Sequence, residues 1–431
     1  MGILRLCCRV NFLWIMCKIC DWIRSKFCDS KTAYEEMEEY KAKYQNPSSR
    51  TTADKGVKIF LSSYHKWRTE VEMAHPSKTG LKLGENLYGE ILIIFSVCLD
   101  KGTLLNVENL KILEGELAYF DEKTGYKFGY DEVICINIGL LWHKLGPEYE
   151  ENAVAAFKKY ILSQLSLSNH TAYGIDECYA FKPITNWLYY SLMNGELNIS
   201  SPTTFNDPFD CPIIQLLENE KEDVAKLISK AYKGCLKIVC FMSNKQLPTS
   251  EDFSRRSKHE GDVPEYLNEL MWAHYADYHK GICIKYHFEA DQTKLPKSTN
   301  TAVSYFRDVN YRDDISLLGK DGNINMHDAF FVKSKAWDYE NELRYLYFDI
   351  NGSGDHQQIK IPNCISAIYF GLRCTDNDRK LIMDLMKGKK WMTEERKFGT
   401  PDKVVEHDVK FYKIVRDKNC FGKLVAEEVK P

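Results

Sequence analysis

The sequence predicts an α+β protein in which a helical N-terminal region precedes a mixed domain with a mainly antiparallel sheet. Between about residues 58 and 168, apolar residues recur at helical spacing, most clearly in the run at 150–165. After about residue 170, short runs rich in β-branched and aromatic residues alternate irregularly with helical segments. This irregular order is typical of α+β domains, because βαβ units would alternate strand and helix one by one.

The composition defines the broad class of the protein. The chain has 431 residues, of which 44% are hydrophobic, so a globular protein of two or three domains is expected. Its net charge of -3 provides no global basic field for nucleic acid. The 15 cysteines are odd in number and scattered, unlike the disulfide framework of a small secreted domain. Reduced thiols and a cytoplasmic location are therefore expected.

Residues 1–50 predict two helices, the first amphipathic and the second, at 31–45, highly charged. The first helix, at residues 3–28, is rich in Trp, Phe and Ile, but its longest clean apolar run, 11–17, is too short to span a bilayer. Such a helix suits a membrane surface, a partner or the protein's own surface, and its few charges favour docking onto protein over membrane association. No small-residue cleavage site follows it, so no signal peptide is expected.

Residues 51–170 predict a mostly helical domain, for which a sensor or regulatory role is a hypothesis. A polar stretch at 46–56 precedes this domain and is typical of a linker. The apolar run at 130–145 fits a helix or a strand equally well. The sequence changes character across the polar segment at 166–177, and we place the domain boundary there.

Residues 171–431 predict the α+β domain. Strands are expected at 177–181, 196–201, 235–242, 281–288, 301–306, 342–350, 358–362 and 366–371. Helices are expected between them at 184–194, 222–232, 326–335 and 376–387. The polar segment at 244–264 predicts a long functional or mobile loop, and the region after about 390 predicts one edge strand with a charged end.

A polar elbow follows the second predicted strand. After Ser200 and Ser201, the turn-forming residues Asn206 and Asp207 lie between two phenylalanines. Turn residues flanked by aromatic residues indicate a loop pinned to the core, which can hold side chains in fixed directions. A structural Asx-turn that simply ends the strand explains the same residues.

A second cluster, at 271–281, contains His274, Tyr275 and His279. A metal-dependent hydrolase would require the two histidines to converge with a carboxylate such as Asp210. Their five-residue spacing fits neither one helix face nor one strand face, so structural histidines are favoured and no metal is expected.

A third cluster contains Glu340, Glu342 and Arg344. In an extended chain these side chains share one face, where two carboxylates repel unless a cation such as Arg344 is close. The pattern fits either a paired-carboxylate site or a solvated strand edge with an ion pair.

Together these clusters resemble a bacterial family, domain of unknown function 2971. The resemblance rests on the order and spacing of motifs across about 179–387: S-x-x-x-FNDPFD, CFMS, MWAHYADYHKGICI, K-x-x-W-x-YE-x-E-x-R and IYFG. The family name implies no activity, so the mechanism depends on the residues themselves.

More distantly, the arrangement resembles ADP-ribosyltransferases. These enzymes begin with a cation-bearing strand and a helix of pattern N-L-x-x-I-L-x-x-G, followed by a Ser/Thr-rich strand and a strand that starts with E-x-E. The corresponding segments are Tyr179 to Lys182, the helix at 184–194, the strand at 198–201, and Glu340 with Glu342. The resemblance implies a split, mainly antiparallel sheet.

The same resemblance implies roles for individual residues, with NAD as the substrate. Glu342 would be the catalytic carboxylate and Glu340 its partner, Lys182 would anchor the pyrophosphate, and Tyr275 would stack on nicotinamide. Related sequences carry arginine at the Lys182 position, and lysine cannot form the bidentate fork. The predicted NAD-binding residues are Tyr179, Lys182, Ser200, Ser201, Asn206, Asp207, His274 and Tyr275.

Three functions therefore compete. The first is an NAD-consuming ADP-ribosyltransferase-like effector, a bacterial toxin or phage-defence protein, whose acceptor is an unknown protein or nucleic acid. The second is a non-enzymatic sensor that binds a nucleotide or peptide. The third is the metal-dependent hydrolase.

Overall fold

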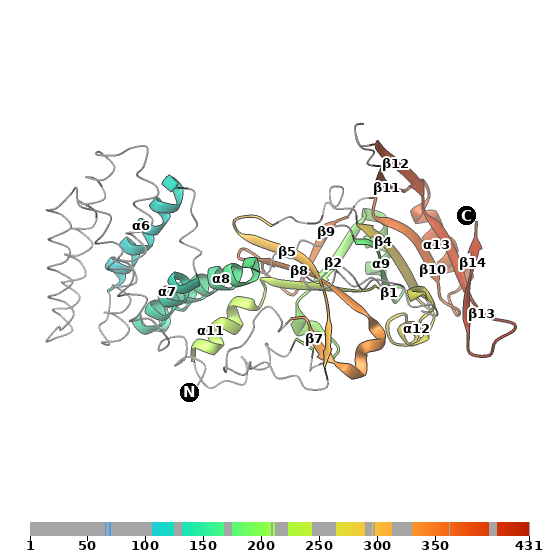
Figure 1. Cartoon of the computed structure of the whole chain (residues 1–431), viewed down its shortest axis with the longest axis horizontal. Helices are drawn as coiled ribbons and strands as arrows, with labels where there is room; N and C mark the ends of the chain where they lie inside the picture. Colours follow the sequence, from blue (N-terminus) through green and yellow to red (C-terminus); the bar gives the residue numbers. More distant parts are fainter. Residues whose placement is uncertain are drawn as a thin grey trace, which may run out of the picture. The chain divides into compact units, whose positions relative to one another are not determined.

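Figure 1 shows a computed structural model of the whole chain. The structure describes residues 106–124, 132–167, 175–207, 210–211, 223–243, 264–288, 295, 298–312, 330–361, 363–395 and 403–430, together with His65 and Thr69. The predictions for residues 1–50, the linker at 46–56, most of the expected helical region before residue 106 and almost all of the loop at 244–264 lie outside these residues. In the described part, no helix is long and apolar enough to cross a membrane.

The chain divides into two compact units, and the described part of the first is helical. Its helices are α6 (Val107–Thr124), α7 (Glu132–Leu145), α8 (Glu150–Leu167) and α11 (Asp223–Tyr232), with the short η2 (Pro147–Tyr149) between α7 and α8. From Glu132 onward, the ambiguous run at 130–145 is therefore helix. Helix α8 packs against both α7 and α11. Gly139 permits the close approach of α7, because a Cβ there would lie 3.0 Å from the ring of buried Phe157.

The second unit is built on a large sheet in which all pairs but one are antiparallel. The strands β14-β13-β10-β4-β1-β3-β2-β9 follow one another, with β8 beside β3 and β5 beside β8. Their bounds are β1 (Ile175–Lys182), β2 (Glu196–Ser200), β3 (Leu236–Met242), β4 (Ile282–Phe288), β5 (Ala302–Asp308), β8 (Glu342–Asp349), β9 (His356–Lys360), β10 (Ile365–Phe370), β13 (Lys410–Arg416) and β14 (Leu424–Val429). The predicted α+β class, the mainly antiparallel sheet and all eight predicted strands are confirmed.

The sheet branches at β3. This strand pairs with β1 only at Tyr179↔Met242 and with β2 only at Ser200↔Ile238, whereas it pairs with β8 over its whole length. The start of β8, where Glu342 lies opposite Met242, is therefore close to the point at which β3 leaves β1.

Each face of the sheet carries its own apolar core. One core contains Ala180 and Ile284, and helices α9 (Asn186–Asn194) and α13 (Asp376–Met386) pack on it through Leu188 and Ile382. Helix α9 starts because Thr185 accepts a hydrogen bond from Leu188 N, and it ends at Gly195 with a φ of 62°.

The opposite core contains Phe181 and Cys283, and helix α12 (Glu269–Tyr275) adds Met271 and Trp272 to it. Alternation along β1 and β4 produces the two cores, because neighbouring residues point to opposite faces. Helix α12 starts at Asn268, whose side chain accepts from two backbone amides, and it follows η4 (Glu265–Leu267).

Two predictions were wrong. The helix expected at 326–335 contains instead strand β7 (Val332–Ser334), which pairs with β6 (Asn310–Arg312), and the start of the 3-10 helix η5 (Lys335–Glu340). Ser334 ends the strand by capping η5, and the apolar residues before it are buried as a short extended segment. The single edge strand expected after 390 is four strands, because a separate hairpin, β11 (Lys390–Glu395) and β12 (Lys403–Asp408), precedes β13 and β14.

Candidate functional site

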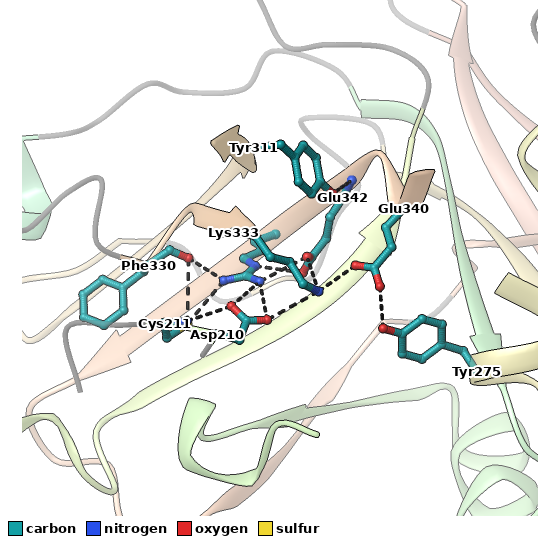
Figure 2. A network of polar contacts seen from close by, with 9 residues as sticks. Asp210, Cys211, Tyr275, Tyr311, Phe330, Lys333, Glu340 and Glu342 are labelled. Atoms are coloured by element: carbon teal, nitrogen blue, oxygen red, sulfur yellow. Dashed lines mark hydrogen bonds and ion pairs between the residues drawn. The ribbon is translucent and has the colours of Figure 1, made fainter. Parts of the chain in front are cut away.

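Five charged side chains are buried together at the start of β8 (Figure 2). They come from the elbow after β2, from β7, from η5 and from β8, and none is more than 9% exposed. Three are carboxylates and two are cations. We call Asp210, Lys333, Glu340, Glu342 and Arg344 the charged cluster.

Arg344 is the centre of this cluster and is completely buried. Its Nη2 donates to both oxygens of Asp210, at 2.7 and 2.8 Å, and its Nε donates to Glu342 Oε1 at 2.8 Å. Nη1 donates to the carbonyl of Phe330 at 2.7 Å and to the thiol of Cys211 at 3.2 Å. The guanidinium thus ties the elbow and Phe330, just before β7, to the start of β8, and such charge-assisted bonds are among the strongest in proteins.

Lys333 is the second cation. Its Nζ lies 2.6 Å from Glu340 Oε2, 3.4 Å from Glu342 Oε2 and 3.5 Å from Asp210 Oδ2. Burial lowers the pKa of Lys333, but the three carboxylates outweigh burial and raise the pKa well above its ordinary value. Lys333 is therefore charged at neutral pH.

The spacing of Glu340 and Glu342 suggested one extended strand, but the backbone between them is not extended. Glu340 is the last residue of η5, Asn341 has a φ of 41°, and Glu342 is the first residue of β8. Both glutamates are 4% exposed, so the solvated strand edge is ruled out. The backbone amide of Glu342 is also satisfied, because it donates to the Tyr311 hydroxyl at 2.8 Å.

The two glutamates differ in their protonation. Burial raises the pKa of Glu342, but Arg344 and Lys333 outweigh it and hold the pKa at about 2. Burial and the charge of Glu342 raise the pKa of Glu340 in spite of Lys333. Glu342 is therefore a fixed negative charge, whereas Glu340 accepts a proton more readily.

Tyr275 joins the cluster from the end of α12. Its hydroxyl donates to Glu340 Oε1 at 2.5 Å, and burial together with Glu340 raises the pKa of Tyr275. Tyr275 is half-buried, and Figure 2 shows its ring at one end of the network, with the hydroxyl directed at Glu340. Exposed His274 lies next to it, with its ring centroid 6.2 Å from that of Tyr339 and 6.5 Å from that of Trp337.

Of the residues predicted from sequence, Tyr275, Glu340 and Glu342 come together. Lys182 is half-buried at the end of β1, and burial lowers its pKa while neighbouring Cys240 raises it. Cys240 also interacts with Glu342, so one thiol neighbours both Lys182 and the charged cluster. In the described part of the chain, Lys182 Nζ forms no hydrogen bond or ion pair.

Other predicted residues lie apart from the cluster. Tyr179 is 3% exposed and packs against Tyr266 and Tyr369, so its ring belongs to the core. Ser200 Oγ bonds His356 Nδ1 at 3.1 Å, and Ser201 caps the short η3 (Pro202–Thr204).

The elbow is pinned to the core, as expected, and Asp210 and Phe205 contribute to this. Asn206 is exposed and Asp207 is half-buried. Asp210 is buried in the cluster, and the guanidinium of Arg344 lies 5.7 Å from the ring centroid of Phe205.

The metal site considered for Asp210, His274 and His279 is not assembled. Both oxygens of Asp210 accept from Arg344, and His274 points into the aromatic group at Trp337 and Tyr339. Across the described ranges, no group of three or more His, Cys, Asp or Glu side chains could hold a metal ion.

Residues 271–345, from α12 into β8, match the family described as "Protein of unknown function (DUF2971)". This segment contains Tyr275, Lys333, Glu340, Glu342 and Arg344, and the match supports the resemblance to that family over these residues. No curated protein and no solved structure matches the chain, so the resemblance to ADP-ribosyltransferases is not shown.

Proposed function

We propose that the second unit consumes NAD by ADP-ribosyl transfer or hydrolysis, with Glu340 and Tyr275 facing the substrate. The observation that carries this proposal is the convergence of Tyr275 and both glutamates of the E-x-E motif in one polar cluster. The carboxylate of Glu340 bonds the half-buried side chain of Tyr275, whereas the carboxylate of Glu342 bonds the buried cations Arg344 and Lys333.

The chemistry requires a carboxylate beside the ribose. Cleavage of the nicotinamide–ribose bond passes through an oxocarbenium-like state, as glycoside cleavage does, and negative charge stabilises it. Glu342, ionised at neutral pH, supplies fixed charge and holds Lys333. Glu340 is then the carboxylate that reaches the ribose, with Tyr275 beside the nicotinamide.

The remaining roles follow from the same arrangement. Lys182, whose Nζ forms no hydrogen bond or ion pair among the described residues, would bind the pyrophosphate as a point charge. The polar side chains after β2 and exposed His274 would border the ligand. The acceptor would be a protein, a nucleic acid or water, and the protein would act as a toxin or phage-defence effector, with the N-terminal region responding to a partner, a trigger or a membrane surface.

NAD consumption by the purified full-length protein tests this proposal. We expect Glu340→Gln and Tyr275→Phe to retain the fold and to lower NAD turnover, the former by about 100-fold or more. Glu406→Gln, an exposed carboxylate on β12, is the matched control and should leave turnover unchanged. Equal turnover in wild type and Glu340→Gln, with candidate acceptors present, would contradict the proposal.

A second function, a nucleotide-binding sensor without chemistry, is favoured by one observation. All six carboxylate oxygens of the cluster already accept a bond or ion pair from Arg344, Lys333 or Tyr275. Such saturation is typical of structural networks. Calorimetric binding of NAD without its consumption, unchanged in Glu340→Gln, would establish this function in place of the first.

A further inference from the structure

The loop after α12 has an unusual backbone. Asp277, Tyr278 and His279 are consecutive, none is glycine, and their φ angles are 44°, 52° and 69°. Non-glycine residues rarely adopt positive φ angles, because the Cβ then approaches the carbonyl oxygen. Where they do, single residues are more common than runs of consecutive residues. Strain of this kind persists only where the surrounding structure enforces it, and it is concentrated at binding sites.

The loop is clamped between two strand ends. The carbonyl of His279 accepts from Arg373 N at 2.9 Å, and the amide of His279 donates to Trp272 O at 3.0 Å. A Cβ on Gly371 would lie 2.2 Å from His279 O, and a Cβ on Gly281 would lie 2.2 Å from Lys182 O. The backbone therefore holds the His279 side chain in a fixed place at this edge of the sheet.

His279 has an unmet hydrogen bond. Its ring stacks at 6.3 Å on buried Trp272, and among the described residues its Nδ1 is buried without a partner. Buried polar atoms without a partner are rare in folded proteins and indicate a missing water or ligand. Burial, followed by the charges of Arg373 and Arg416, lowers the pKa of His279 despite Glu269, so the ring is neutral and can donate a hydrogen bond.

Two exposed arginines lie at the same edge. Strands β10 and β13 are parallel, with Phe370 opposite Lys413, so Arg373 just after β10 and Arg416 at the end of β13 share one end of the sheet. Within the described residues, neither guanidinium forms a hydrogen bond or ion pair. Two uncompensated guanidinium groups beside a neutral imidazole form a donor set suited to a phosphate group.

We propose that His279, Arg373 and Arg416 bind a phosphate group of a small ligand, at a site separate from the charged cluster. The donors are few and the chain carries a net charge of -3, which favours a small phosphorylated molecule over a nucleic-acid backbone. The strained loop places the imidazole, and the arginines provide the charge. The site does not depend on NAD chemistry.

Calorimetric titration of the full-length protein with inorganic pyrophosphate tests this inference. We expect about one site per chain, with Arg373→Ala and Arg416→Ala each weakening binding by about tenfold or more. His279→Gln should weaken it less. Lys410→Ala, which removes an exposed cation at the opposite end of β13, is the matched control and should bind like the wild type.

The outcomes separate this site from the proposed activity. Absence of pyrophosphate binding in the folded wild type would overturn it, and so would equal weakening by Lys410→Ala, which would indicate diffuse surface charge. Tight binding of an oligonucleotide without binding of pyrophosphate would overturn it in favour of a nucleic-acid surface. NAD turnover, measured on the same variants, tests the proposed NAD site, which contains none of His279, Arg373 and Arg416, so either result can fail without the other.

Discussion

The charged cluster and the His279 loop lie in the same unit, but they differ in whether their polar groups are paired. In the cluster, three carboxylates and two cations are buried, and each forms an ion pair with at least one member of opposite charge. At the loop, a buried ring nitrogen and two exposed guanidinium groups lack partners among the described residues. The comparison distinguishes polar groups that support the fold from groups that await a ligand.

The difference follows from the cost of desolvation. Buried charges remain in a protein only when opposite charges and hydrogen bonds compensate them, and removing one member exposes the others to the full penalty. Exposed cations carry no such penalty, so a fold can leave them unpaired for a ligand. Mutations should therefore affect stability in the cluster and ligand binding at the loop.

The largest expected effect comes from Arg344→Met. This change leaves Asp210 and Glu342 buried without their main partner, and we expect a loss of about 3–5 kcal/mol in the free energy of unfolding, measured by urea denaturation. Arg416→Met makes the same substitution at an exposed site and should change stability by less than about 0.5 kcal/mol. Equal losses of unfolding free energy in the two variants would contradict the proposed difference between the regions.

The next effect concerns acid stability. The pKa of Glu342 is 4.5 when unperturbed and about 2 in the folded chain, so the folded state binds fewer protons than the unfolded state between these values. Its contribution, about 3 kcal/mol, is fully present above pH 4.5 and disappears as the pH falls through 2. We expect wild type to lose about 2 kcal/mol more between pH 6 and pH 3 than Glu342→Gln does. Parallel acid profiles for the two proteins would show that Glu342 is not held ionised.

A smaller effect is expected where the cluster meets the surface. Tyr275→Phe removes the donor to Glu340 Oε1, so stability should fall by about 1–2 kcal/mol and the pKa of Glu340 should rise further. Urea denaturation and an NMR titration of the glutamate carboxyl groups measure the two changes. Tyr190→Phe, at an exposed tyrosine of α9, is the control and should change neither quantity.

The elements of the fold were largely predictable because their signals are local. Apolar alternation and helical spacing identified the main strands and the helices α8, α9, α11 and α13. Strand β7 and η5 were missed because each is short and because Ser334 caps η5 within a run that has helical composition. The apolar pattern at 130–145 did not distinguish a helix from a strand. In the structure, helix α7 in this run packs against α8.

The charged cluster was only half predictable. The E-x-E spacing singled out Glu340 and Glu342, but Lys333 fell within the expected helix. Asp210, which lies 134 residues before Arg344, was considered only as a metal ligand. Tertiary pairing brings these residues together, and no local pattern records it. The strain at the His279 loop was equally hidden, because neither Asp277 nor Tyr278 is the glycine that normally marks a positive φ.

The smallest expected effect tests that strain directly. Tyr278 is 67% exposed with a φ of 52°, so Tyr278→Gly relieves a steric cost of about 1 kcal/mol while adding a similar cost in chain entropy. We expect the free energy of unfolding to change by less than about 0.5 kcal/mol. Tyr190→Gly, at an exposed helical site without strain, should lose about 1 kcal/mol by the same urea assay. If both variants lose the same amount, the loop stores no strain, and the phosphate site would then depend on the unpaired histidine and arginines alone.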